Sequence, residues 1–128
     1  MEDIEKIIDQ SVNRAIARLM ESGIIQTNQS TPEQKTEELL FKYEQFKRSD
    51  QVFTLKVLAQ IDDALKTIQA DPYFRIIPMY YFDGLTMEVI SEQLDNHIRT
   101  IRRNKRRLIR HLAAILFSDD VINEIYKE

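Results

Sequence analysis

A chain of 128 residues with 43% hydrophobic residues can build one domain with a real core, but it leaves no room for a second, enzyme-sized domain. Its 18 basic and 21 acidic residues give a net charge of −3, so the chain as a whole lacks the positive charge common in nucleic-acid-binding domains. There is no cysteine, no apolar run of membrane-span length and a charged start, which together predict a cytoplasmic protein without disulfides or membrane contact. Two glycines and three prolines leave few places for phosphate-binding loops or β-hairpins, so we expect an all-α fold.

The first predicted element is an amphipathic helix within residues 1–25. Apolar residues recur at helical spacing from Ile4 to Met20 and end at Ser22 and Gly23, a C-terminal stop signal. Residues 26–31 are polar, lack apolar periodicity and resemble a flexible linker. Two interpretations stay open: the helix packs on its own domain, or it mediates self-association or partner binding. The linker favours the second, so we expect a homo-oligomer, a dimer, held together by residues 1–25.

Residues 32–70 are predicted to form a helical hairpin. Thr31, Pro32 and Gln34 make a capping box with proline at the first helical position, which starts a helix that extends to about residue 48. A second helix is expected over residues 51–69, capped by Ser49 and Asp50. The inward-facing residues of the two helices are predicted to be Leu39, Leu40, Tyr43, Phe46, Val52, Leu55, Leu58, Ile61, Leu65 and Ile68.

Residues 71–128 are predicted to form a tri-helical unit. Asp71 and Pro72 start a helix that carries aromatic residues as far as Gly84. Thr86 has the chemistry of an N-cap for a short helix, and residues 95–97 (Asp-Asn-His) interrupt the apolar pattern. A longer helix then begins at Ile98. After it, residues 118–120 can start a last helix whose apolar side chains fold back on the core.

The charge of the chain is concentrated on the helix that begins at Ile98. Residues 97–111 hold seven basic residues and no acid, about +7, while the rest of the chain carries about −10. Placed at 100° intervals, the six arginines fall opposite an apolar stripe of Ile101, Leu108, Leu112 and Ile115. Lys105 falls on the apolar side instead. A solvated charged face usually mixes signs to gain i,i+4 pairs, and this one has no acid within it, which favours DNA or RNA binding.

The sequence around this helix resembles the sigma-70-like helix-turn-helix. Leu85-Thr86, Ile90-Ser91-Glu92 and Thr100-Ile101 match the family's recurring positions, and residues 79–84 are similar to its aromatic lead-in. Together with the acidic, helical N-terminal half, the run from Arg103 to Ile109 is most similar to ArpU/RinA-type phage regulators, which activate late genes of prophages. The resemblance covers roughly residues 55–118. Asp95 stands where the family usually has glycine, and Asp tolerates the left-handed backbone angles of such a turn.

The resemblance implies that the N-terminal turns of the second helix enter the major groove of double-stranded DNA. Ile98, Arg99, Arg102 and Arg103 can then reach base edges, and Arg99 and Arg103 are the predicted guanine contacts. The residues predicted to meet phosphates lie further along the helix, and they are Arg106, Arg107 and Arg110. The predicted DNA-binding set also includes Thr86, His97 and Thr100.

Enzyme chemistry finds little support in the sequence. His97 and His111 are fourteen positions apart in a basic helix, with neither cysteine nor an acidic pair nearby to complete a metal site. Asp62 and Asp63 are interpreted as a solvated face, and Tyr80 and its tyrosine neighbours as packing residues. We therefore expect no enzyme, no metal and no cofactor. Besides a transcription regulator, two functions remain open: a phage DNA-packaging or structural adaptor, and a protein-binding module acting on RNA polymerase.

Overall fold

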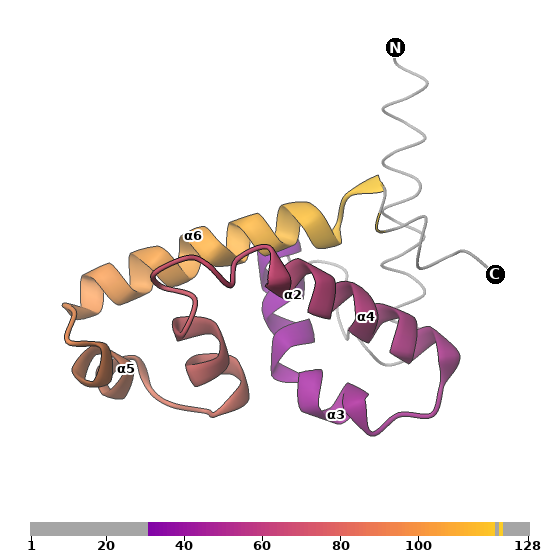
Figure 1. Ribbon diagram of the computed structural model, residues 1–128, viewed down its shortest axis with the longest axis horizontal. Helices are drawn as coiled ribbons and strands as arrows, with labels where there is room; N and C mark the ends of the chain where they lie inside the picture. The colour runs from indigo at the N-terminus through magenta and orange to yellow at the C-terminus, as the bar shows by residue number, and fades with distance from the viewer. Residues whose placement is uncertain (1–30, 120, 122–128) are drawn as a thin grey trace, which may run out of the picture.

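The computed structural model describes residues 31–119 and 121. This part of the chain contains helices and turns but no strand, which confirms the all-α fold class. The predicted helix within 1–25, linker residues 26–30 and residues 122–128 lie outside the described residues. In chain order the helices are α2 (Pro32–Phe41), α3 (Tyr43–Lys47), α4 (Val52–Lys66), the π-helix η1 (Pro78–Phe82), α5 (Met87–Leu94) and α6 (Ile98–Leu116) (Figure 1). None of the helices in this range is long and apolar enough to cross a membrane.

The start of α2 is the predicted capping box. The Thr31 hydroxyl accepts the Gln34 backbone N–H at 3.2 Å, and the Gln34 side chain accepts the Thr31 N–H at 2.9 Å. Pro32 occupies the first helical position, where its missing N–H costs no helical hydrogen bond. These three residues therefore fix where the described chain turns helical.

The predicted helix from residue 32 to 48 is divided at Lys42, where φ is −94° and ψ is 3°. Phe41 contacts the ring of Tyr81 edge-on (4.8 Å between centroids), and Tyr43 stacks on Phe82 (4.5 Å). Residues 41 and 43 would lie 200° apart on an ideal helix. Because both contact neighbouring residues of η1, the local unwinding at Lys42 lets both rings face the same element.

The inward face of α4 agrees with the prediction only in its second half. Ile61 is fully buried, and Leu65 and Ile68 are nearly so. By contrast, Val52 and Leu55 are 70% and 42% exposed. Thr54 and Val57 are buried in their place. The first turn of α4 lies at the end of the helix away from α6, so less surface covers it than covers the C-terminal turns (Figure 1).

The start of α4 also differs from the prediction. Gln51 is the N-cap residue and makes no side-chain cap bond. The Ser49 hydroxyl accepts the N–H of Gln51 at 3.1 Å, one position before the helix, and so stabilises the preceding turn.

The helix predicted between residues 71 and 84 was largely wrong. Residues 72–75 form turns, and regular helical bonding begins only near Ile76. Pro78 is the physical reason, because it has no N–H to donate and its ring displaces the preceding turn. The chain continues as the π-helix η1, in which the Asp83 N–H donates to the Pro78 carbonyl at 2.9 Å, five residues back.

Two clusters of buried side chains organise these helices around α6. The larger cluster joins α2, α3, α4 and η1 to the C-terminal half of α6, where Leu108, Leu112 and Leu116 are buried. Val121 is part of it, as expected for the chain after Ser118. The smaller cluster joins η1, α5 and the N-terminal half of α6 through Ile76, Met79, Ile90 and Ile101. The predicted units 32–70 and 71–128 therefore share α6, whose N-terminal end extends beyond α2 and α4 together with α5 (Figure 1).

Candidate nucleic-acid interface

The turn between α5 and α6 is set by the backbone of Asp95. Its φ of 51° and ψ of 50° are the left-handed conformation in which glycine is most common. The Asp95 N–H donates to the Glu92 carbonyl (3.3 Å) and the Asn96 N–H to the Ser91 carbonyl (3.1 Å), the bonds of a Schellman motif. The Ser91 hydroxyl also donates to the Asn96 carbonyl. The expected left-handed backbone at Asp95 is confirmed, and the turn fixes the direction in which α6 starts.

Both helices of this pair begin at side-chain caps. The Thr86 hydroxyl accepts the Val89 N–H at 3.2 Å, as predicted. The Nδ1 atom of His97 accepts the Arg99 N–H at 3.1 Å and caps α6. A ring nitrogen accepts only when it carries no proton, so this bond requires the tautomer with hydrogen on Nε2. Thr86 and His97 cap the helices, and because both are exposed they also remain accessible to a ligand.

Four arginines follow one another along the exposed side of α6, and we call them the arginine line: Arg99, Arg103, Arg106 and Arg110. Their spacing of four, three and four residues keeps them on one side, over about 16 Å at a rise of 1.5 Å per residue. All four are exposed, and none makes a hydrogen bond or ion pair with another described residue. The line therefore offers four guanidinium groups to an anionic ligand.

The remaining predicted site residues lie on the flanks of the arginine line. Arg102 is exposed on the side facing α2 and has no partner among the described residues. Ile98 and Thr100 are partly buried. The Thr100 carbonyl accepts the amide of Asn104 at 2.9 Å, a bond that reinforces the second turn of α6.

Arg107 differs from the other arginines because an acid from outside the helix holds it. Its two terminal nitrogens donate to the two oxygens of Asp71 at 2.8 and 2.9 Å, and its Nε donates to Asn104 at 3.2 Å. Asp71 also accepts the Tyr73 N–H at 2.9 Å. The hydrogen bond from Arg107 is the main reason that the pKa of Asp71 lies below its ordinary value. The expectation of a basic face without acid partners was wrong at this position.

Lys105 is likewise paired, on the opposite flank. Its ammonium lies 3.4 Å from a carboxylate oxygen of Glu37 on α2 and 4.7 Å from the centre of the Tyr80 ring. The same Glu37 oxygen accepts the Tyr81 hydroxyl at 2.7 Å. Burial and this bond raise the pKa of Tyr81 well above its ordinary value. As predicted, Lys105 lies on the apolar side of α6, and its end is only partly exposed.

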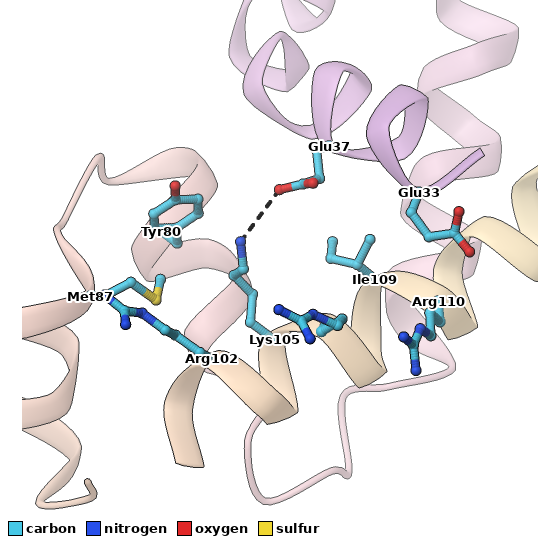
Figure 2. A pocket seen from close by; sticks show the side chains of 9 residues that line it. Glu33, Glu37, Tyr80, Met87, Arg102, Lys105, Ile109 and Arg110 are labelled. Carbon is cyan, nitrogen blue, oxygen red and sulfur yellow. Dashed lines mark hydrogen bonds and ion pairs between the residues drawn. The ribbon is translucent and has the colours of Figure 1, made fainter. Parts of the chain in front are cut away.

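A groove of about 640 Å³ lies between α2 and α6 (Figure 2). The α6 wall carries Arg102, Lys105, Arg106 and Arg110, and the α2 wall carries Glu33 and Glu37. The remaining lining residues are apolar or aromatic and come from η1, α5 and α6; they are Tyr80, Met87 and Ile109. The groove thus combines four cations, two carboxylates and an apolar surface, and it opens beside the arginine line.

The described residues contain no cluster of His, Cys, Asp or Glu side chains that could hold a metal ion. Comparisons with protein-family models, with curated proteins and with solved structures gave no match. The resemblance to sigma-70-like proteins thus stays a prediction from the sequence.

Sequence reasoning missed the residues that border the arginine line. Asp71 was interpreted only as a helix start, and Tyr80 as a packing residue, while Glu37 drew no attention at all. Each is far from α6 in the sequence: Asp71 lies 36 positions before Arg107, and Glu37 lies 68 before Lys105. No local periodicity signals pairs at such separations. The acidic excess outside residues 97–111 was the only hint that partners existed.

Proposed function

We propose that this chain is a sequence-specific DNA-binding transcriptional regulator that inserts the N-terminal half of α6 into the major groove. The observation that carries the proposal is the arginine line, four exposed guanidinium groups that have no partner among the described residues, on the second of two helices joined by a tight turn. In this proposal α5, the turn and α6 form a helix-turn-helix. The sequence resemblance further suggests an activator of prophage late genes.

The major groove of B-DNA is about 12 Å wide and admits one α-helix. The N-terminal half of α6 is suited to enter it, since its buried Ile101 packs with residues of η1 and α5, while the buried residues of α2 and α4 pack against the C-terminal half. Arg99 and Arg103 lie in that half and are the proposed base readers. Arg106 and Arg110 come one to two turns later and would meet phosphates at the groove edge. The positive end of the helix dipole, with no acid in the first turn, adds to this attraction.

The competing explanation is that the arginine line is an ordinary solvated surface. Surface helices gain stability by pairing opposite charges at i,i+3 and i,i+4. Among the described residues, ion pairs of that kind occur at the end of α2 and within α3 and α4, for example Glu38 with Lys42. The arginine line has no such pair, and self-repulsion among its members costs stability that an anionic ligand would offset.

Salt dependence is the first test of DNA binding. Each neutralised phosphate contributes about −0.9 to the slope of log affinity against log salt, so three to five contacts give about −3 to −5 for each bound copy. The measurement is a fluorescence-anisotropy titration of duplex DNA at several salt concentrations. Arg48→Ala is the charge-matched control, because Arg48 is exposed at the end of α3, away from α6, and its loss should leave the slope unchanged. A slope near zero would reject the proposal.

Sequence reading is tested by alanine variants on a site selected from random DNA. Arg99→Ala and Arg103→Ala should each cost about 1–3 kcal/mol on the selected site and relax preference at one base pair. Arg110→Ala should weaken binding to selected and random DNA alike. Equal losses for all three on both DNAs would mean that α6 binds without reading sequence. A genome-wide binding profile then separates a regulator, bound upstream of an operon, from a packaging adaptor.

A further inference from the structure

The groove between α2 and α6 has the chemistry of a small-ligand site. Its volume of about 640 Å³ lies within the range of about 300–1,000 Å³ that is typical of ligand pockets. Its walls come from α2, η1, α5 and α6, so elements distant in sequence converge on it (Figure 2). A ligand of this groove must satisfy cationic, acidic and apolar lining groups together.

The α6 wall calls for an anion. Arg102, Arg106 and Arg110 repeat every four residues, which sets them about 6 Å apart along the helix axis. None of the three pairs with a described residue, and Lys105 adds a fourth cation to the same wall. Planar guanidinium groups bind phosphate oxygens in pairs, so a phosphate chain fits this row better than a single small anion does.

The α2 wall calls for hydrogen-bond donors. Glu37 is already occupied by Lys105 (3.4 Å) and the Tyr81 hydroxyl (2.7 Å). Glu33 lines the groove and makes no hydrogen bond or ion pair with a described residue, and a carboxylate can only accept. A purely anionic ligand would leave Glu33 facing like charge, whereas hydroxyl or amino groups would satisfy it.

The apolar lining adds the third requirement. Met87 and Tyr80, both partly buried, present carbon and sulfur atoms at the end of the groove beside Arg102, whereas Ile109 is 3% exposed and adds little surface (Figure 2). A ligand that carries phosphates, hydroxyl or amino donors and a flat apolar ring meets all three conditions. We propose that the groove binds a nucleoside phosphate, with the phosphates on the arginines of α6 and the ribose or base donors at Glu33.

Such binding would oppose DNA binding, and this consequence rests on the proposed function. Arg106 and Arg110 belong both to the groove and to the arginine line, so they cannot fully satisfy nucleotide and DNA phosphates together. A nucleotide would therefore weaken DNA affinity. The site itself can be tested without DNA, so its failure and the failure of the proposed function are distinguishable.

The test is calorimetric titration of the full chain, without DNA, with ATP, GTP, CTP and UTP. Inorganic tripolyphosphate serves as the probe of matched charge. At least one nucleotide should bind about tenfold or more tightly than tripolyphosphate, a difference of about 1.4 kcal/mol. If none binds more tightly than tripolyphosphate, the groove is only a cationic surface and the proposal is wrong.

Two variants locate the binding. Arg106→Ala should weaken the nucleotide about tenfold because a charge-assisted phosphate contact is lost. Arg103→Ala removes the same charge one turn earlier, outside the groove lining, and should change it less than about twofold. Equal losses in both variants would place the nucleotide elsewhere on α6.

Glu33→Ala gives the sharpest discrimination. Removing a carboxylate should tighten tripolyphosphate, because repulsion is relieved, and weaken the nucleotide, because an acceptor for its donors is lost. Opposite shifts support the site as described. If both ligands bind more tightly to Glu33→Ala, the carboxylate only repels anions and the nucleoside part of the proposal is refuted.

Discussion

The Asp71–Arg107 pair should stabilise the fold more than an ordinary surface ion pair does. Exposed single pairs contribute about 0.2–1 kcal/mol, but this one is bidentate, at 2.8 and 2.9 Å, and joins residues 36 positions apart. Because the Arg107 side chain is 50% exposed, solvent screens part of the attraction. We therefore expect a coupling energy of about 1 kcal/mol from a double-mutant cycle of Asp71→Asn and Arg107→Gln.

Asparagine is the appropriate replacement because Asp71 also accepts the Tyr73 N–H, and an amide oxygen keeps that turn bond. The assay is urea denaturation of the four proteins of the cycle. Asp63 and Lys66 on α4 form the control pair, with one 3.7 Å contact and both side chains about two-thirds exposed. Their cycle should give less than about 0.5 kcal/mol. Equal coupling in the two cycles would refute the argument that bidentate geometry makes the difference.

The same pair has a definite pH dependence. Arg107 holds the pKa of Asp71 below its ordinary value, so the folded protein binds that proton less readily than the unfolded chain. The contribution is fully present above the ordinary carboxyl pKa near 3.8 and is lost as pH falls through the depressed value. Wild type should thus lose more stability on acidification than Asp71→Asn does. On DNA, Asp71→Asn frees Arg107, so the salt slope should steepen by up to about 0.9.

Three further predictions concern other parts of the chain. Asp95→Gly should raise the free energy of unfolding by about 0.5–1 kcal/mol, because the backbone there is left-handed, with φ at 51°. Asp83→Gly, at φ −88°, should lower that free energy instead. Both are measured by urea denaturation, and a lower free energy of unfolding in both variants would contradict the reasoning from the left-handed backbone. Burial and the bond to Asp62 raise the pKa of Tyr43 to about 12, so stability should fall between about pH 10 and 12, and less in Tyr43→Phe, when melting is followed against pH. Deleting residues 1–25 should turn a dimer into a folded monomer, as measured by sedimentation. If the full-length and the truncated protein are both monomers, that segment is not the dimer contact.

Local signals predicted the local structure well. The capping box at Thr31, the cap at Thr86 and the left-handed turn at Asp95 each depend on residues within a few positions of one another, and all three are present. The apolar stripe of α6 was predicted for the same reason, because one helix face is visible in the sequence as a period of 3.6 residues. The charged side of the candidate interface followed directly from that stripe.

Pairings across the fold were beyond this reasoning. Periodicity predicts the side of the helix on which Arg107 lies, but not that Asp71 lies next to it. The position of Asp71 depends on the turn at residues 72–75, where a helix was expected. The exposure of Val52 shows the same limit, because an apolar stripe does not reveal how far a neighbouring helix reaches. Predicting the groove requires both the face of each helix and the packing of α2 against α6, and only the face can be inferred from the sequence.

The π-helix η1 has a consequence for how the molecule unfolds. Its wide turn spreads consecutive side chains in different directions, so Met79 enters the smaller cluster, Tyr81 binds Glu37 on α2, and Phe82 stacks on Tyr43. Five residues thereby tie both clusters together. Opening either cluster disturbs the other through this segment, so slowly exchanging amides in α4 and α5 should be released in one cooperative event rather than in sequence.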